Sequence, residues 1–544
     1  MTASSTRQEY RLMRITNKIM QRNSLTNINS NKELQDNLTT QMSTQKKINR
    51  ASDDPVIAIR ALRLRSNVTE VTQYYSKNIP DADSWLQVTE DALKNTSAIV
   101  TKMIEQATRG SNGDLTSSDR KIILEQLRAL GDEVYKTGDA SYAGRYVFTG
   151  YRTDTSLSFQ EETKNIKYTI TEQLDKSAIS DMTSVNIGAL GKWTSANYDT
   201  DTDLQSLNES GVTTADVHRI RLAYEDLDEG SELKIGYTDG TGAPQEIPAA
   251  YNVNSTDITT LGMDPYAYVA NNADAVVLVR DTGELLIGEN VYRKLMDTKD
   301  DPTTATTNEA EIRITYQKTN FAADDLRPEH YYACEGQKLM EDTATGNMVN
   351  DGEPIKYNQD YLKGIVDKQS IEYDVGFNQT IRVNSTADES YNLGIGREVD
   401  DLVRALQNVI NLEETKASIE KKIANTTDEA KLTILNNQLV AANKAYDYAK
   451  DLCQKRFESG ITSFQGYLDD TSLAITNVGT RSSKLELIQS RMQNQKTTFE
   501  TLKSQNEDID ITEVAIQLSS SEMTYQAALT ATGKIIQNTL LNYI

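Results

Sequence analysis

Residues 68–107 read VTEVTQYYSKNIPDADSWLQVTEDALKNTSAIVTKMIEQA and predict one long helix. Alternate steps of four and three residues keep to one helix face, and nine of the twelve side chains on that face are apolar. Burying nine side chains at about 2 kcal/mol each does not offset about 1–2 kcal/mol of backbone ordering for each residue. The helix therefore needs a partner. The twelve positions are Val68, Thr72, Tyr75, Ile79, Ala82, Leu86, Thr89, Leu93, Thr96, Val100, Met103 and Ala107.

The far end of the chain repeats this spacing. Met492 and Phe499 continue the pattern in phase, so we expect the two chain ends to form one helical bundle. Pro80 interrupts the first helix. Because the heptad phase survives through it, we expect one kinked, continuous helix, with two separate helices as the alternative. The C-terminal positions are Phe457, Ile461, Phe464, Leu468, Thr471, Ile475, Val478, Ser482 and Leu485.

Two weaker helical segments lie outside this bundle. Residues 13–50 have thinly spread apolar side chains, and half of the seam is amide, which indicates a helix poorly ordered until it meets a partner surface. Residues 511–544 carry a shorter amphipathic pattern, and we expect the two segments to pair. The seam positions are Leu34, Leu38, Gln41, Gln45 and Ile48 in the first segment, and Val514, Leu518, Tyr525, Leu529, Ile536 and Leu540 in the second.

The stretch from Asn49 to Pro55 joins the first tail segment to the bundle. Pro55 suits a first helical turn, and it leaves Asp54 or Ser52 as the N-cap. The carboxylates of Asp53 and Asp54 lie near the positive end of the following helix. We therefore interpret them as capping residues and not as a paired-carboxylate active site.

The rest of the chain alternates between helical and strand patterns. Thr116 begins a second helix, which should pack antiparallel to the first. From Gly144 the period changes, and residues 145–150 read as a strand leaving the helical region. Further strand patterns with turns lie at 233–240, 276–287 and 371–383.

These patterns predict an α+β, multidomain fold in which a long-helix coiled-coil bundle is formed by both chain ends and a large β-rich domain is inserted. The expected segments are 1–12 as an extension, 13–50 as the N-terminal tail helix, 51–150 as the first half of the bundle, 151–400 as the acidic insert, 401–505 as the second half of the bundle and 506–544 as the C-terminal tail helix.

Charge is concentrated in the insert. Residues 151–400 contain 45 Asp and Glu against 21 Lys and Arg, which leaves 35 acidic and 36 basic residues elsewhere. This indicates a solvated domain, with cation binding as the alternative, and it argues against a nucleic-acid partner. No apolar run approaches 18 residues, so no membrane span is expected. Residues 1–12 contain no apolar segment typical of a secretion signal.

No motif predicts catalysis, a cofactor or a metal site. Asp199-x-Asp201-x-Asp203 resembles the start of a calcium loop but lacks the turn glycine and the bidentate glutamate. The only histidines, His218 and His330, have no nearby metal-ligand partners in sequence. Cys334 and Cys453 fit no metal or disulfide spacing, and whether they meet is open.

Several motifs resemble the flagellin superfamily. Met13–Thr16 resembles its N-terminus, which makes residues 1–12 an extension, and Ile48–Pro55 resembles its hallmark after the first tail helix. Other motifs are similar to the members that join hook to filament, and filament subunits usually have a different pattern at Gly144–Gly150 and at the C-terminal end. These motifs are Arg63-Leu64-Arg65, Asn78–Leu93, Gly144–Gly150, Gln526–Leu529 and Leu540–Ile544. The resemblance covers residues 13–150 and about 450–544.

The resemblance implies a structural subunit of the bacterial flagellum that self-associates in a helical layer, between a hook-associated protein and flagellin. It further implies export through the flagellar type III apparatus with a chaperone, an extracellular location and no cofactor. Filament flagellin and a secreted coiled-coil adhesin or effector are the alternatives. We expect one residue set to fix the turn between tail and bundle and another to form the packing stripe of the C-terminal helix. These sets are Asn49, Arg50, Asp53, Asp54 and Pro55, and Leu518, Tyr525, Leu529, Ile536 and Leu540.

Overall fold

The computed structural model describes residues 17–247, 251–298, 312–341, 348–359, 361 and 369–537. They divide into two compact units, each considered separately below. The terminal unit comprises Met1–Pro80, Asp374–Gln379 and Glu486–Ile544, and the central unit comprises Asp81–Tyr373 and Thr380–Leu485. The motifs at Met13–Thr16 and Leu540–Ile544 lie outside the described residues.

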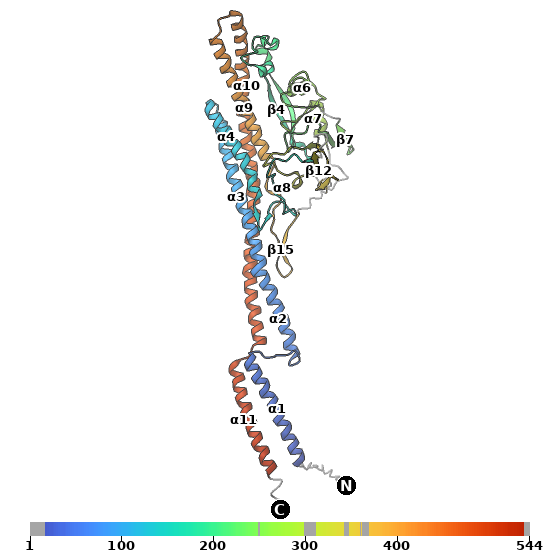
Figure 1. Cartoon of the computed structure of the whole chain (residues 1–544), viewed down its shortest axis with the longest axis vertical. Helices are drawn as coiled ribbons and strands as arrows, with labels where there is room; N and C mark the ends of the chain where they lie inside the picture. The colour runs from blue at the N-terminus through green and yellow to red at the C-terminus, as the bar shows by residue number, and fades with distance from the viewer. Residues whose placement is uncertain are drawn as a thin grey trace, which may run out of the picture. The chain divides into compact units, whose positions relative to one another are not determined.

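Helices dominate the terminal unit (Figure 1). They are α1 (Asn17–Thr44), α2 (Pro55–Gln73), a π-helical turn η1 (Tyr74–Asn78), the last part of α10 (Glu429–Glu507) and α11 (Ile511–Gln537). α3 (Ile79–Gly110) follows η1 directly, so the chain stays helical through Pro80. The Ile79 N–H donates to the Tyr74 carbonyl, five residues back, which is the pairing of a π-helix. One wider turn thus lies immediately before a residue that has no N–H to donate, and the prediction of a continuous helix is confirmed.

The seam of α3 is buried as its spacing predicts. All nine predicted positions from Ile79 to Ala107 have no exposed surface. Thr89 and Thr96, the two hydroxyl side chains among them, donate to the carbonyls of Trp85 and Ala92 and so leave no unpaired donor in the core. Every predicted position on α10 is at least half-buried, and Phe457, Phe464 and Val478 are completely buried.

Four helices share one apolar core in the central unit: α3, α4 (Ser117–Val134), α9 (Gly394–Ala424) and α10. Thr116 caps α4 in a capping box with Asp119. Gly110, at the end of α3, lies so close to Phe457 that a Cβ atom there would be 2.2 Å from the ring. The close approach joins the N-terminal and C-terminal halves of the bundle, as predicted.

The C-terminal half of the bundle differs from the expectation in two respects. α9 begins at Gly394, before the expected Asp401. The Gly396 N–H in its first turn donates to the Tyr135 hydroxyl at 2.9 Å. Gly394 lies so close to Tyr467 that a side chain at this position would meet the Tyr467 side chain. A turn after Ala424 then separates α9 from α10, whose first N–H groups are capped by Asp428.

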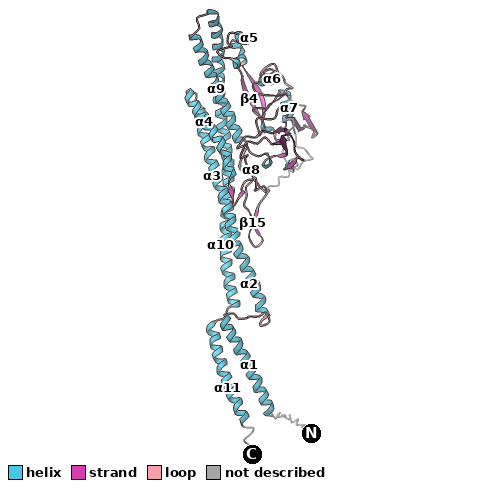
Figure 2. Cartoon of the chain, viewed as in Figure 1, coloured by secondary structure: helices cyan, strands magenta, loops and turns pink. Residues whose placement is uncertain are grey.

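The insert is built on two larger antiparallel-rich sheets (Figure 2). The first has the order β4-β5-β10-β9-β8, and the second has the order β13-β12-β3-β11-β6-β7 with β14 also paired to β12. The strands are β3 (Ile166–Leu174), β4 (Ile179–Asn186), β5 (Thr213–Arg221), β6 (Lys234–Thr238), β7 (Pro244–Ile247), β8 (Tyr251–Val253), β9 (Val276–Val279), β10 (Glu284–Ile287), β11 (Ile312–Lys318), β12 (Ala333–Glu341), β13 (Met348–Asn350) and β14 (Ile355–Tyr357).

Besides five short 3₁₀ helices, the described residues also form two hairpins and four short α-helices. They are β1 (Ser141–Tyr142) with β2 (Arg145–Tyr146), β15 (Glu372–Gly376) with β16 (Gln379–Arg382), and α5 (Thr202–Gln205), α6 (Pro265–Asn271), α7 (Glu289–Met296) and α8 (Ala387–Ser390). The predicted fold class, a bundle formed by both chain ends with a β-rich insert, is confirmed.

Three predicted strand patterns are confirmed, and one is wrong. β9 and β10 pair across the predicted turn, and strands form at 234–238, 372–376 and 379–382. The expected strand at 145–150 stops after Tyr146. Gly144 and Gly150 have φ of 76° and 60°, so the chain turns at both ends. Phe148 instead packs edge-to-face on Tyr391, with ring centroids 4.9 Å apart.

A buried charge cluster lies where the first sheet meets the bundle within the central unit. Asp401 of α9 accepts from the guanidinium groups of four arginines on β5, α9 and α10. Burial opposes ionisation of Asp401, but Arg219, Arg456 and the others nevertheless hold its pKa well below its ordinary range. The apolar core of the bundle also takes in insert residues such as Leu190, Tyr198 and Val212, so the insert meets the bundle through apolar packing as well as through these ion pairs. The four arginines are Arg219, Arg221, Arg404 and Arg456.

Glu172 on β3 predicts a pH dependence of stability. Burial raises its pKa to about 7, and its carboxyl accepts the Ala223 N–H at 2.9 Å and the Tyr316 hydroxyl. Because the folded chain binds this proton more tightly than the unfolded chain, stability falls as pH rises from about 4 to about 7. Glu172→Gln keeps both acceptor contacts and removes the ionisation. We expect its free energy of unfolding, relative to the native chain, to rise by about 2 kcal/mol between pH 5 and pH 8.

Urea denaturation at the two pH values, followed by the fluorescence of Trp85 and Trp193, measures this difference. Glu246→Gln removes an exposed carboxylate of the same domain and is the matched control, expected to show no such change. Parallel pH profiles for Glu172→Gln and the native chain would contradict the assignment.

Candidate assembly interface

The two tail helices α1 and α11 pack along each other and form the element that we call the tail pair (Figure 1). This confirms the predicted pairing, but the predicted α1 seam is wrong at Leu34 and Gln45, which are exposed. Their seam is unusually polar. On α1 five of the seven seam residues carry an amide or a hydroxyl, and on α11 Ser521 and Thr532 lie fully buried. The seam consists of Gln21, Ser24, Ile28, Asn31, Gln35, Leu38 and Gln41 on α1, and Val514, Leu518, Ser521, Tyr525, Ala528 and Thr532 on α11.

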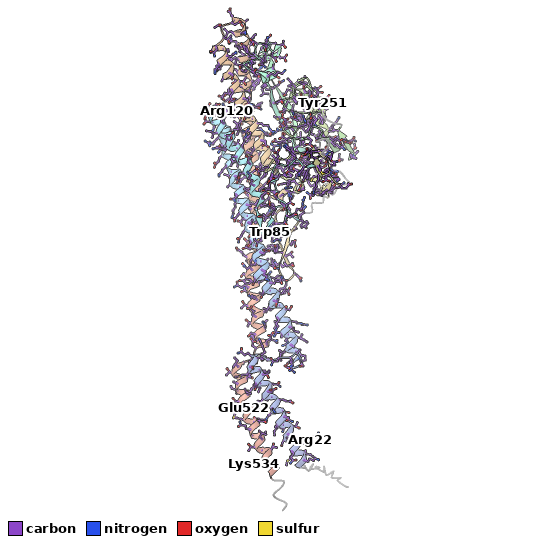
Figure 3. The ribbon with its side chains drawn as sticks, viewed as in Figure 1. Arg22, Trp85, Arg120, Tyr251, Glu522 and Lys534 are labelled. Carbon is purple, nitrogen blue, oxygen red and sulfur yellow. The ribbon has the colours of Figure 1, made fainter. Side chains whose placement is uncertain are left out.

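Large apolar side chains of the tail pair lie outside this seam. Ile516 and Met523 are 66% and 67% exposed, and other apolar residues are between 37% and 57% exposed. Arg22, Glu522 and Lys534 share the exposed surface (Figure 3). Exposed apolar surface of this extent is typical of a protein interface. The other exposed apolar residues are Ile19, Met20, Leu25, Leu34, Met42, Ile511 and Leu529.

The residues predicted as a packing stripe on α11 divide into three groups. Leu518 and Tyr525 are half-buried on the seam toward α1. Leu529 is 45% exposed and lies beside that seam, where the neighbouring Ala528 occupies the seam position. Ile536 belongs to α11, and Leu540 lies outside the described residues. Their role in assembly therefore stays a prediction.

The residues predicted to fix the turn lie together in one tight connector between α1 and α2. Of the two candidate caps, the structure uses Asp54, whose carboxylate accepts the N–H groups of Val56 and Ile57 at 2.9 and 3.1 Å. Asp53 folds back and accepts from the N–H groups of Arg50 and Asn49 at 2.8 and 3.1 Å.

These two hydrogen bonds lower the pKa of Asp53, Arg50 contributing most. Pro55 is the first residue of α2. Each predicted turn residue thus has a place in the connector.

Glu507, at the end of α10, is the residue that sequence reasoning missed. Its carboxylate is 3% exposed and forms a bidentate pair with Arg65 of α2, with N–O distances of 2.7 and 2.8 Å. Its carbonyl accepts the Lys47 N–H at 2.7 Å, and Lys46 lies 3.6 Å from its side chain. Arg65 is the chief cause of the lowered pKa of Glu507. Glu507 therefore joins the end of α10 both to α2 and to the connector between α1 and α2.

α2 presents a second open surface. Val56, Ile59 and Leu62 are 59%, 54% and 65% exposed, although the opposite face of the helix is buried through Ala58 and Ala61. Arg60 and Arg63 flank them and form no ion pair or hydrogen bond within the described part of the chain. Apolar and cationic groups thus lie together, open to a partner.

The groups considered for chemistry have structural partners. Asp201 caps α5, and Asp199 pairs with Lys431 at 2.8 Å, so the calcium-like motif is a turn. His218 contacts the carboxylates of Asp181 and Glu289. His330 donates to the Ser156 carbonyl, and burial lowers its pKa to about 4.

Both cysteines are free and buried, and burial raises the pKa of Cys453 to about 12. A thiol with so high a pKa is almost entirely protonated at neutral pH and is a poor nucleophile.

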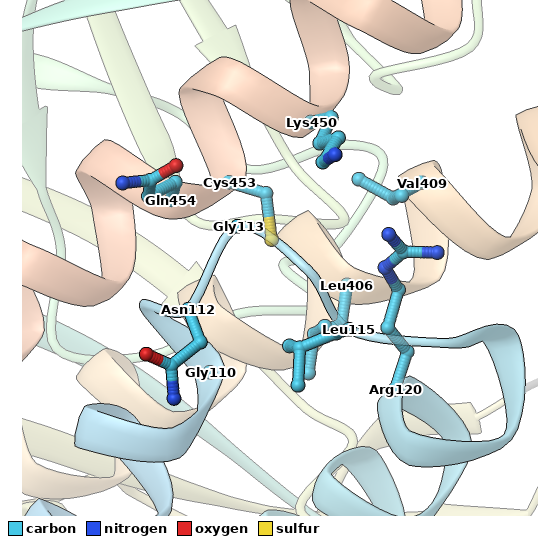
Figure 4. Close-up of a pocket in the computed structure, with 10 residues that line it drawn as sticks. All are labelled: Gly110, Asn112, Gly113, Leu115, Arg120, Leu406, Val409, Lys450, Cys453 and Gln454. Atoms are coloured by element: carbon cyan, nitrogen blue, oxygen red, sulfur yellow. The ribbon is translucent and has the colours of Figure 1, made fainter.

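A small cavity lies between the α3–α4 loop, α9 and α10 (Figure 4). Its volume is about 20 Å³, room for roughly one water molecule. Arg120, on its wall, is paired with Glu413 at 3.0 Å. The cavity is too small for an organic substrate. No helix among the described residues is long and apolar enough to cross a membrane.

Comparison with known proteins identifies the N-terminal region. Residues 15–153 match the bacterial flagellin N-terminal helical region. Flagellar hook-associated protein 3 of Escherichia coli is 29% identical over 140 residues, 25% of this chain and 44% of that protein. A Bacillus subtilis flagellin is 26% identical over 216 residues, 38% of this chain and 70% of that protein.

The chain spans about half the length of the hook-associated proteins that it matches, 44% in Escherichia coli and 52% in Salmonella typhimurium. A solved structure of flagellar hook-associated protein 3 from Legionella pneumophila aligns with 10% identity and a TM-score of 0.26, over 81% of this chain and 98% of that chain.

Removing the charge of Glu507 should loosen the connector. Glu507→Gln leaves Arg65 without its anionic partner, while Lys46 keeps its ion pair with Asp508 at 2.5 Å. The connector should therefore open more often, and we expect trypsin to cleave after Lys46 and Lys47 about tenfold faster. Glu500→Gln, an exposed change on the same helix, is the matched control and should keep the native rate. The fragment rates are measured by mass spectrometry under native conditions. Equal rates for Glu507→Gln and the native chain would show that Glu507 does not hold the connector.

Proposed function

We propose that this chain, whose residues 15–153 match the bacterial flagellin N-terminal helical region, is a structural subunit that joins the hook of the bacterial flagellum to its filament. The observation that carries the proposal is the tail pair, with its polar seam and its open apolar surface. Such a pair is incomplete in a single copy and is completed by neighbours in a polymer. Relatives named flagellar hook-associated protein 3 support the junction role.

In the proposed assembly the terminal helices pack between copies and form a helical layer. The apolar residues exposed on α1, α2 and α11 become buried there, which supplies the driving force. Contacts of this kind are heterologous, so they extend a layer without closing on themselves. The layer stops growing if its two faces prefer different neighbours, a hook-associated protein on one side and flagellin on the other.

The connector residues Asn49, Arg50, Asp53, Asp54 and Pro55 hold the tail pair to α2 in this proposal. Asp53 and Asp54 use their carboxylates to satisfy backbone N–H groups in the connector, and Glu507 ties the returning chain to it. A connector of fixed geometry lets each copy present its tail pair in the same orientation, as a regular layer requires. The insert, with its excess of carboxylates, then faces solvent.

The proposal includes export through the flagellar type III apparatus, with a chaperone on the tails, to an extracellular site on the flagellum. The polar seam supports it, because a weakly stabilised tail pair opens at low cost. It requires no cofactor and no enzymatic activity. Filament flagellin is the second candidate, because the match to Bacillus subtilis flagellin covers 70% of that protein.

Location on the flagellum tests the proposal directly. Immunogold labelling of intact cells with antibody to residues 151–400 should give a single band between hook and filament. A strain lacking the gene is the control and should show no band. Label along the whole filament would establish that the chain is a filament flagellin. Label only in the medium would refute a structural role in the flagellum.

Leu529→Asp tests the role of the tail surface. The side chain is 45% exposed, so the substitution should leave the thermal unfolding of the isolated chain unchanged, while a carboxylate in a buried interface blocks assembly and motility. Thr524→Asp, an exposed position on another face of α11, is the matched control. Normal motility of a strain carrying Leu529→Asp would contradict the assignment of this surface.

A further inference from the structure

α11 carries two seams, and within the described residues only the first is packed against a partner helix, α1. The second runs along the face away from α1, again in steps of three and four residues. All five of its positions are exposed, and Ile516 and Met523 are the most exposed apolar side chains of the tail pair. The second seam consists of Glu513, Ile516, Ser520, Met523 and Ala527. This spacing places the five positions along one face of the helix, where another helix can pack against them.

The open stripe on α2 matches this second seam in spacing and in charge. Val56, Ile59 and Arg63 follow one another at intervals of three and four residues on one exposed face. The stripe ends in a cation that has no ion pair within the described residues, whereas the second seam of α11 begins with an anion. The carboxylate of Glu513 accepts only from the neutral amide of Gln517, at 3.0 Å, among the contacts described.

We propose that the second seam of α11 in one copy docks on the α2 stripe of a second copy of this chain, in antiparallel orientation. Glu513 then faces Arg63, Ile516 faces Ile59, and Ser520 faces Val56. The inference rests on the proposed function, since it names the contact by which copies assemble.

The charges select the orientation. In an antiparallel pair the order Glu513, Ile516, Ser520 meets the order Arg63, Ile59, Val56, so the anion meets the cation and Ile516 meets Ile59. A parallel pair in the same register would place Arg63 opposite Ser520 and Val56 opposite Glu513, so the two charges would not meet. The exposed apolar residues of α1 do not offer an equivalent site, because Ile19, Leu25 and Leu34 lie on different faces of that helix.

A charge exchange tests the contact in the full-length chain. Arg63→Glu and Glu513→Arg are both exposed changes, so each purified variant should keep the native thermal unfolding. Expressed in a strain lacking the gene, each should be exported normally and yet reduce filaments per cell about tenfold, because like charges meet in a buried contact. The double variant Arg63→Glu with Glu513→Arg should restore at least half of the filaments.

The outcomes of the charge exchange either support the contact between copies or overturn it. A double variant as defective as the single variants, or single variants with full filament numbers, would overturn the contact. Retention of the single variants inside the cell would also overturn it, because the faces would then serve an export partner. Recovery in the double variant supports it.

Cysteine crosslinking separates this contact from the junction role. Flagella are isolated from cells that express both Ile59→Cys and Ile516→Cys copies, and mild oxidation should give dimers. The native cysteines are buried and do not compete. Gln526→Cys in place of Ile516→Cys is the control and should give none. If dimers form but immunogold label runs along the whole filament, the contact is supported and the junction role is refuted. If immunogold label lies between hook and filament but no dimers form, the contact is refuted and the junction role is supported.

Discussion

The packing of α3 against α10 is the interaction on which the rest of the structure depends. It brings together residues near position 100 and residues near position 460, with Gly110 in close contact with Phe457. Once the two ends share one core, the chain between α4 and α9 must leave the bundle and return to it. That is why the β-rich region is an insert and not a domain appended to one end. The completely buried seam from Ile79 to Ala107 makes this arrangement cooperative.

Periodic and local features could be read from the sequence, and pairings between distant residues could not. The α3 seam, the capping box at Thr116 and the cap at Asp54 depend on residues within a few positions of one another. Arg65 pairs with Glu507, and Arg219, Arg221 and Arg456 pair with Asp401, across long stretches of the chain, and no local pattern marks these pairs. Only Arg404, three residues from Asp401, is a local partner in that cluster. The tail helix shows the same limit on a smaller scale. The period predicts a seam, but only the packing with α1 shows that Ala528 and not Leu529 occupies it.

The charge of the insert has two separate physical roles. Its excess of exposed carboxylates opposes association and keeps the domain hydrated. Its arginines Arg219 and Arg221 are instead buried against Asp401, where desolvation cancels much of the Coulomb attraction. Such a cluster adds little stability compared with an apolar contact, but it accepts few orientations, because an arginine displaced from its carboxylate is left buried and unpaired. The sheet is therefore held at a defined angle on the bundle within the central unit.

The same reasoning explains why the tail pair is polar where it is closed and apolar where it is open. A seam of Asn31, Gln35 and Ser521 stabilises the pair only weakly, because it buries little apolar surface and the buried Ser521 hydroxyl has no hydrogen-bond partner within the described residues. An apolar seam of the same length would hold α1 and α11 together strongly in every copy and would leave little to be gained by adding neighbours. With the apolar side chains on the outer faces, most of the favourable burial becomes available only when copies meet. The distribution of side chains thus makes the ordered state of the tails a property of the assembly more than of the single chain.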